Sequence, residues 1–206
     1  MDFRLQPYRI CCVSGPSQSG KTEFVLRLLR NRHELFRKPL NKILWCYGVH
    51  DTSLLTRLHN EGYKTLRGLP KETDIESESI CILDDLLSES ETSKAVTNMC
   101  TRASHHKRFF LIFISQNLFP GGKDARTRSL NTHYYIIFKN PRDKQQFEVF
   151  ARQILPSRSK DLNAIYEDAT RKPHGYLFID FTQECPDEYR FRTNVLDDPV
   201  VYYRLV

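Results

Sequence analysis

Apolar runs that predict strands alternate along this chain with segments that carry apolar residues at helical spacing. Strands are predicted at 8–14, 42–48, 78–86, 108–116 and 132–139, and helices at 21–31, 52–62 and 91–104. The strand runs are short and continuously apolar, which is typical of strands buried on both faces of a parallel sheet. The pattern therefore predicts an α/β fold with a doubly wound, mainly parallel sheet.

The region after residue 140 extends this pattern. Helices are predicted at 141–155 and 157–170 and a strand at 175–181, followed by a charged tail interrupted by prolines. Pro141 suits the first helical position, with Asn140 as the cap. A chain of 206 residues fits one well-buried domain. We expect a single domain over 1–206, with 1–9 and 195–206 as peripheral terminal segments.

The stretch GPSQSGKT, residues 15–22, lies between the first predicted strand and the first predicted helix. It matches GxxxxGK[ST], the P-loop or Walker A pattern, whose glycines let backbone N–H groups point at a phosphate. We expect Lys21 to reach the β and γ phosphates of ATP and the Thr22 hydroxyl to ligate Mg²⁺. The predicted nucleotide-binding residues are Gly15, Pro16, Ser17, Gln18, Ser19, Gly20, Lys21 and Thr22.

Paired carboxylates follow four apolar residues in ICILDD, residues 80–85, at the end of a predicted buried strand. Carboxyl ends of parallel strands form the ligand edge of such a sheet, so this pair is predicted to lie beside the phosphate loop as a Walker B motif. Asp84 would hold Mg²⁺ through its water shell, and Asp85 would polarise the attacking water. The alternative is that the pair only caps the following helix and places acidic residues in its first turn.

Gln116 directly follows the apolar run RFFLIFIS. If that strand lies between the P-loop strand and the Walker B strand, its terminal polar residue points at the γ phosphate, where a glutamine can orient water. The alternative is a polar residue that satisfies local backbone groups.

A glycine pair at 121–122 precedes a basic stretch that contains Lys123, Arg126 and Arg128. Such a loop can be a solvated turn, a DNA contact or a source of arginine fingers for a neighbouring subunit. We predict that Arg126, or else Arg128, acts in trans. The sequence SHHKR at 104–108 is interpreted as a polar turn without a metal, because adjacent helical histidines point about 100° apart.

Composition narrows the class of protein only in part. The net charge of +6 favours polyanionic partners without identifying them. The six cysteines have no zinc-finger spacing, and four lie in predicted strands, which favours buried structural thiols. No run has the length of a membrane span or the pattern of a signal peptide, so we expect a soluble, intracellular protein.

Several segments taken together resemble the genome-packaging ATPases of Polinton (Maverick) elements and adintovirus-like DNA viruses, in the FtsK/HerA superfamily of ring-forming DNA translocases. The similarity runs from about Arg9 to Asn194, and LNTHYYIIFKNPRD is its most specific part. The segments are GPSQSGKT, ILDDL, SHHK, SQNLF, RTRSLNTHYYIIFKNPRDKQQ, ARQILP and PHGYLFIDF. The broader superfamily usually has glutamate where this chain has Asp85, whereas the narrower viral branch resembles it in having two aspartates.

The resemblance implies strands added around the P-loop strand and a catalytic set that maps onto Lys21, Thr22, Asp84, Asp85 and Gln116. It further implies an ATP- and Mg²⁺-dependent motor that packages double-stranded DNA into capsids. The implied partners are viral capsid proteins and copies of the chain in a hexameric or pentameric ring, in the host nucleus or at a viral assembly site. Two alternatives stay open: a small P-loop kinase, and a nucleotide-gated assembly module that does not hydrolyse ATP.

Overall fold

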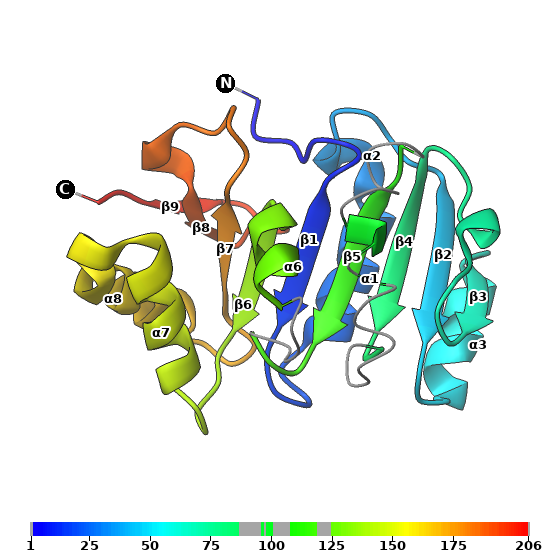
Figure 1. The fold of residues 1–206 in the computed structure, drawn as a ribbon, viewed down its shortest axis with the longest axis horizontal. Coiled ribbons are helices and arrows are strands. Elements are labelled where there is room, and N and C mark those ends of the chain that lie inside the picture. The colour runs from blue at the N-terminus through cyan, green and yellow to red at the C-terminus, as the bar shows by residue number, and fades with distance from the viewer. Residues whose placement is uncertain (1, 87–95, 97, 101–107, 119–124, 206) are drawn as a thin grey trace.

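A computed structural model describes residues 2–86, 96, 98–100, 108–118 and 125–205 of the chain. Within these ranges nine strands form one sheet, in the order β3-β2-β4-β5-β1-β6-β7-β8-β9 (Figure 1). The first six strands of this order are mutually parallel, and the last three are joined antiparallel. The predicted α/β fold with a mainly parallel sheet is confirmed.

The elements have the following bounds in the described residues. The strands are β1 Ile10–Ser14, β2 Lys42–Tyr47, β3 Lys64–Arg67, β4 Ser79–Asp84, β5 Phe110–Ser115, β6 Tyr134–Phe138, β7 Tyr176–Asp180, β8 Phe191–Thr193 and β9 Val201–Tyr203. The α-helices are α1 Lys21–Arg30, α2 Arg32–Leu35, α3 Thr52–Asn60, α6 Ala125–Asn131, α7 Gln145–Ile154 and α8 Ser159–Ala169. Three 3₁₀ turns are η1 Glu72–Asp74, η3 Pro156–Arg158 and η4 Asp187–Tyr189. None of these helices has the length and apolar run that a bilayer crossing needs.

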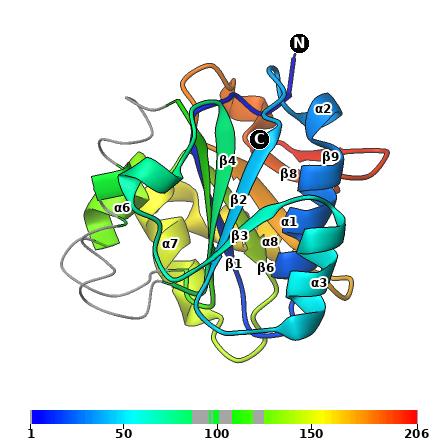
Figure 2. The same ribbon diagram turned by 90° about the vertical axis from the view of Figure 1, so that its right-hand side faces the viewer.

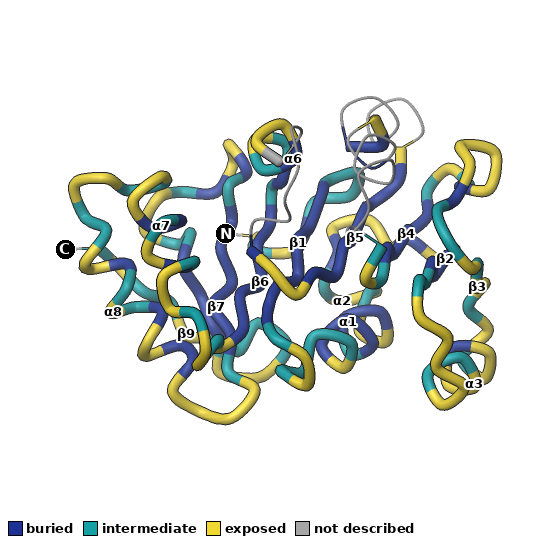
Figure 3. The backbone as a smooth tube through the Cα atoms, turned by 60° about the horizontal axis from the view of Figure 1, so that its bottom comes forward, coloured by how far each residue is buried: buried dark blue, intermediate teal, exposed yellow. Residues whose placement is uncertain are grey.

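Helices cover both faces of the sheet, with α1, α2 and α3 on one side and α6 and α7 on the other (Figure 2). Because successive strand residues point to opposite faces, Cys11 and Val13 join the core under α1, while Cys12 joins the core under α7. The central strands are the most buried part of the chain (Figure 3). All six cysteines are buried free thiols, as predicted, and burial raises the pKa of the Cys12 thiol.

Aromatic side chains hold α1 against the sheet beside the end of β1. The ring of Phe24 packs edge-on against Tyr176 at 4.8 Å and against Phe138 at 6.0 Å between ring centroids. Each such pair contributes about 0.5–1.5 kcal/mol beyond its buried area. These contacts fix the start of α1 relative to the carboxyl ends of β1 and β6, where the phosphate loop lies.

The hydrophobic pattern did not predict three of the described strands, namely β3, β8 and β9. Strand β3 is a sheet edge whose residues are mostly exposed, so its sequence KTLR carries little apolar signal. Strands β8 and β9 have three residues each and extend the sheet beyond β7. The buried ion pair of Arg192 with Asp180, at 2.8 Å, joins β8 to β7.

The predicted start of the helix after β6 is wrong. Helix α7 begins at Gln145, whereas the prediction placed its first residue at Pro141. The Asn140 side chain accepts hydrogen bonds from the backbone N–H groups of Arg142 and Asp143, each at 3.2 Å, and so forms a turn in place of a helix cap. The carboxylate of Asp143 accepts from the N–H of Gln146 at 3.2 Å. Residues 139–144 therefore form a loop beyond the carboxyl end of β6.

Parts of three predicted features lie outside the described residues. The helix predicted at 91–104 is described only at residues 96 and 98–100, where Val96 and Cys100 are buried. The glycine pair at 121–122, Lys123 and most of SHHKR lie in the segments that are not described.

Candidate phosphate-binding site

Residues 15–20 join the carboxyl end of β1 to the start of α1 in a conformation that depends on glycine. A Cβ atom on Gly15 would lie 2.7 Å from Cβ of Phe138, so any side chain here would displace β6. Gly20 has φ 107° and Gln18 has φ 63°, both in the left-handed region that glycine adopts without strain. The backbone of the loop is therefore tightly turned at Gln18 and Gly20.

The interior of this loop fits an anion. The hydroxyl of Ser19 is buried and has no hydrogen-bond partner among the described residues. Helix α1 has no side-chain cap, so its first N–H groups are free to bind a phosphate group at the positive end of the helix dipole. An orphaned hydroxyl and uncapped N–H groups in one loop are the donors that a phosphate group needs.

Lys21 is held by the loop itself. Its ammonium group donates to the carbonyl oxygens of Gly15 at 2.7 Å and of Pro16 at 2.8 Å. Burial lowers the pKa of Lys21, and the negative charges of Asp85 and Asp84 oppose that shift. The same two carboxylates thus act electrostatically on the lysine at the phosphate loop, and Thr22 follows it as a half-buried residue at the start of α1.

Asp84 is the last residue of β4 and is largely buried. Its Oδ2 accepts a hydrogen bond from Nε1 of Trp45 at 3.2 Å. Trp45 is fully buried on β2, one diagonal step from Asp84 in the parallel register. Burial raises the pKa of Asp84 to about 6, against the lowering effect of the Trp45 hydrogen bond. The carboxylate is fixed in direction and is held where a bound cation would favour its ionised form.

Asp85 and Gln116 meet across the ends of two neighbouring strands. Strand β5 lies between β1 and β4, as the interpretation of Gln116 required. Nε2 of Gln116 donates to Oδ2 of Asp85 at 3.1 Å, and both side chains are exposed. The backbone of Asp85 has φ 53° and its N–H donates to the carbonyl of Ile114 at 3.3 Å, which turns the residue out of the line of β4.

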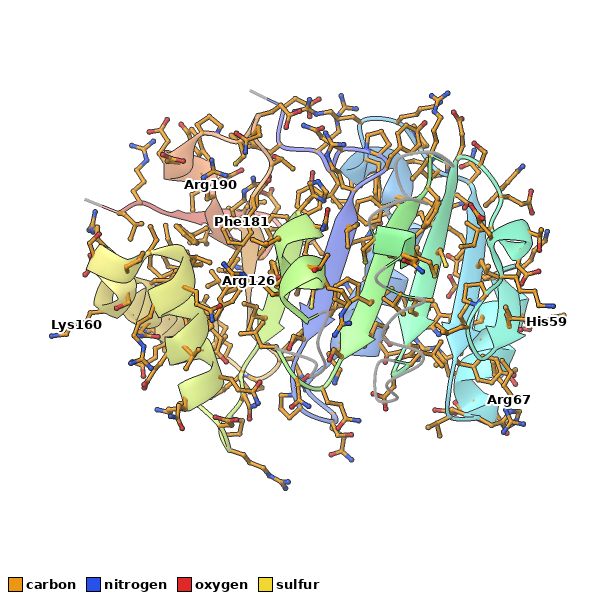
Figure 4. The ribbon with its side chains drawn as sticks, viewed as in Figure 1. His59, Arg67, Arg126, Lys160, Phe181 and Arg190 are labelled. Carbon is orange, nitrogen blue, oxygen red and sulfur yellow. The ribbon has the colours of Figure 1, made fainter. Side chains whose placement is uncertain are left out.

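The two arginines proposed as fingers lie on α6 and differ in exposure. Arg126 is exposed, and Figure 4 labels it beside α6, away from the edge where the phosphate loop lies. Arg128 is only 2% exposed, so a neighbouring subunit cannot reach it in this conformation. Neither arginine is among the charges that shift the pKa of Lys21.

Sequence reasoning missed Trp45, Phe138 and His174, which contact the predicted site residues. His174 lies 3.1 Å from the carbonyl oxygen of Ser19. Each of the three belongs to a different element, far along the chain from its partner. The quoted segments LNTHYYIIFKNPRD and PHGYLFIDF contain Phe138 and His174, but the sequence reasoning gave neither residue a role.

No protein-family model matches the chain, and no curated protein matches it. Solved structures do match its backbone, and one of them is EssC (ATPases 2 and 3) from Geobacillus thermodenitrificans, with 12% sequence identity and a TM-score of 0.48. The match covers 68% of this chain and 33% of that chain, so this chain spans about a third of the length of that protein. We assign no function from a likeness of this size.

Proposed function

We propose that this protein is a Mg²⁺-dependent ATPase. The observation that carries the proposal is the hydrogen bond between Gln116 and Asp85, at the sheet edge that also presents Lys21 and Asp84. A loop built only to bind phosphate has no need of a carboxylate and an amide that converge from two separate strands. Such a pair is suited to hold and polarise a water molecule for attack on a phosphoryl group.

Each residue has a distinct part in this proposal. The N–H groups of residues 15–22 bind the phosphates, and Lys21 leaves its carbonyl partners to neutralise charge that develops on the transferring group. Thr22 and Asp84 would hold Mg²⁺, Thr22 by its hydroxyl and Asp84 through the water shell of the ion, and Mg²⁺ when bound would neutralise charge on the phosphate oxygens. Trp45 orients Asp84 through its indole N–H, as partners of metal ligands commonly do.

We further propose that hydrolysis drives the movement of double-stranded DNA, in a ring of identical subunits that packages a viral genome into a capsid. The support is the resemblance of the quoted segments to packaging ATPases, together with the net charge of +6, which favours a polyanionic partner. Capsid proteins would be the second partner. The Gln116–Asp85 pair is exposed, which favours transfer of the phosphoryl group to water. A kinase would instead transfer that group to a bound acceptor.

Substitutions of Asp84 and Asp85 are expected to impair different steps, nucleotide binding in one case and hydrolysis in the other. Asp84→Asn should weaken binding of Mg²⁺ with ATP, because an amide oxygen carries no charge for the cation. Asp85→Asn should leave binding within about twofold and lower turnover by about 10²- to 10⁴-fold, because it removes the base that activates water. Fluorescent-nucleotide titration measures the first effect, and phosphate release measures the second.

Asp143→Asn is the matched control, since Asp143 is a carboxylate in the loop after β6 that contacts Gln146 and none of the proposed site residues. It should bind and hydrolyse ATP like the unchanged protein. Normal binding and normal hydrolysis in both Asp84→Asn and Asp85→Asn would show that the Walker B assignment is wrong.

Double-stranded DNA is expected to stimulate ATP turnover, and the stimulation should fall steeply as salt rises. Counterion release makes such contacts salt-dependent, because each phosphate contact contributes to the slope of log affinity against log salt. Turnover should be measured with and without DNA at several salt concentrations, with the mass of the protein in solution recorded in parallel.

The same measurements separate the alternative functions. Phosphoryl transfer to a small acceptor without a response to DNA would favour the kinase. Nucleotide binding without turnover, in rings as well as in single subunits, would favour the assembly module. Turnover that DNA does not change at any salt concentration would contradict the motor and leave the ATPase standing.

A further inference from the structure

A segment distant in sequence lies on the phosphate loop. Residues 170–175 join α8 to β7, and Nδ1 of His174 is 3.1 Å from the carbonyl oxygen of Ser19. The same Nδ1 lies 3.3 Å from where a Cβ atom on Gly20 would be. The imidazole therefore contacts the last turn of the loop before α1, and the absence of a side chain on Gly20 makes room for it.

The segment that carries His174 is firmly anchored. The hydroxyl of Thr170 donates to the carbonyl of Tyr166 at 2.7 Å, and the N–H of Gly175 donates to the carbonyl of Lys172 at 3.0 Å. A Cβ atom on Gly175 would lie 2.8 Å from the carbonyl oxygen of Ala169. The turn is thus closed by hydrogen bonds and by close backbone packing.

Tyr166 ties this part of α8 to the end of β6. Its hydroxyl donates to the carbonyl of Phe138 at 2.9 Å and accepts from the N–H of Asn140 at 3.1 Å. Phe138 is also the residue that Gly15 packs against. The support for His174 and the wall of the phosphate loop are therefore one connected unit.

The contact fixes which ring nitrogen carries a proton. A carbonyl oxygen only accepts, so Nδ1 of His174 must carry the hydrogen that it donates to Ser19. Nε2 has no partner among the described residues, and the side chain is exposed. The ring thus has one nitrogen committed to the loop backbone.

The hydrogen bond from His174 to the Ser19 carbonyl also fixes the direction of the N–H group of Gly20. In a trans peptide the C=O and the following N–H point in opposite directions, so a carbonyl drawn toward His174 turns the N–H of Gly20 the other way. That N–H makes no hydrogen bond within the described residues. A carbonyl turned inward would instead repel a phosphate group, because both carry negative charge.

We propose that His174 is a positioning residue for the phosphate loop, which it holds in its anion-binding conformation through the Ser19 carbonyl. The inference rests on the proposed nucleotide site and adds to it a residue from the opposite side of β1. Asp84, Asp85 and Gln116 come from β4 and β5, whereas His174 precedes β7, on the β6 side of β1. His174 thereby supports the loop on the side of β1 opposite to Asp84 and Asp85.

The test compares His174→Gly with His174→Asn. His174 has φ 58°, a left-handed conformation that glycine and asparagine both adopt readily, so neither change strains the backbone. The amide nitrogen of asparagine takes about the place of Nδ1 and can still donate to Ser19, whereas glycine removes the donor. The difference between the two variants therefore reports the side-chain contact with Ser19 together with the greater backbone freedom of glycine.

Binding of Mg·ATP and of Mg·tripolyphosphate should be measured for both variants, together with KM and kcat. His174→Gly should weaken binding of both probes by about 3- to 10-fold, the value of one hydrogen bond. KM should rise in parallel while kcat stays within about twofold. His174→Asn should restore binding to within about twofold of the unchanged protein.

Three results would overturn this inference: unchanged binding in His174→Gly, equal loss in His174→Gly and His174→Asn, or loss for ATP with none for tripolyphosphate. Loss for ATP alone would show that His174 contacts the nucleoside part of ATP and not the phosphate loop. Failure of the proposed function looks different, because the unchanged protein would then either bind neither probe or bind Mg·ATP without turnover. Lys172→Ala, an exposed neighbour whose backbone carbonyl alone supports the turn, is the control and should bind both probes normally.

Discussion

Lys21→Ala is expected to reduce Mg²⁺-dependent ATP hydrolysis to background, a loss of about 10³-fold. Removing one fixed donor that faces developing negative charge costs about 10²- to 10³-fold, and Lys21 also contributes a full positive charge. Its ammonium group donates to the carbonyls of Gly15 and Pro16, which are replaceable partners. Phosphate release at saturating ATP measures the loss.

Two companion variants make this result specific. Lys21→Met keeps the apolar stem of the side chain and should fail as completely, which would assign the effect to the charge. Lys160→Ala removes an exposed lysine at the outer edge of α8, far from the loop, and should retain full turnover (Figure 4). Normal hydrolysis by Lys21→Ala would mean that the P-loop assignment is wrong.

Arg126→Ala is expected to lower turnover by about 10³- to 10⁵-fold in the assembled ring, if Arg126 reaches the nucleotide of a neighbouring subunit. A guanidinium supplied in trans binds the phosphate oxygens that gain charge during transfer. Arg126 is the exposed member of the two candidates on α6, and it is not part of the site in its own chain. An isolated subunit should therefore be a poor ATPase.

Mixing two inactive variants tests catalysis across the boundary between subunits. Arg126→Ala subunits keep an intact phosphate loop, and Lys21→Ala subunits keep Arg126, so mixed rings should recover part of the turnover. Arg67→Ala, which changes an exposed arginine on the edge strand β3, keeps both Lys21 and Arg126 and should hydrolyse ATP normally without mixing. If mixing restores nothing, Arg126 does not act in trans. A loss of salt-dependent DNA affinity with normal basal hydrolysis would instead assign it to DNA contact.

The burial of Asp84 has a stability cost. Its pKa of about 6, against an ordinary 3.8, means that the folded state binds this proton more tightly than the unfolded state does. Stability is therefore lost as pH rises between about 4 and 6, by an amount on the order of 3 kcal/mol. The cost is consistent with a carboxylate kept for a cation and not for the fold.

The hydrophobic pattern by itself determined the fold class and most of the elements. Buried parallel strands need continuous apolar runs such as ICCV and FLIFI, and the switch to helical spacing after residue 20 is equally local. The phosphate loop could also be read directly, because its glycines, Lys21 and Thr22 are adjacent in the chain. The Walker B pair could be proposed from the sequence because two aspartates directly follow four apolar residues of a predicted strand.

Only the tertiary structure decided the strand order and the contacts between distant residues. The position of β5 between β1 and β4, which places Gln116 against Asp85, depends on crossovers that no local pattern encodes. The burial of Arg128 and the short strands β8 and β9 follow from packing around a helix and a sheet edge. The contacts of Trp45 and His174 with the site could be identified only from the tertiary structure, for the same reason. Periodicity reports which face a residue occupies, whereas a hydrogen bond to Asp84 or to Ser19 depends on which element the fold places beside it.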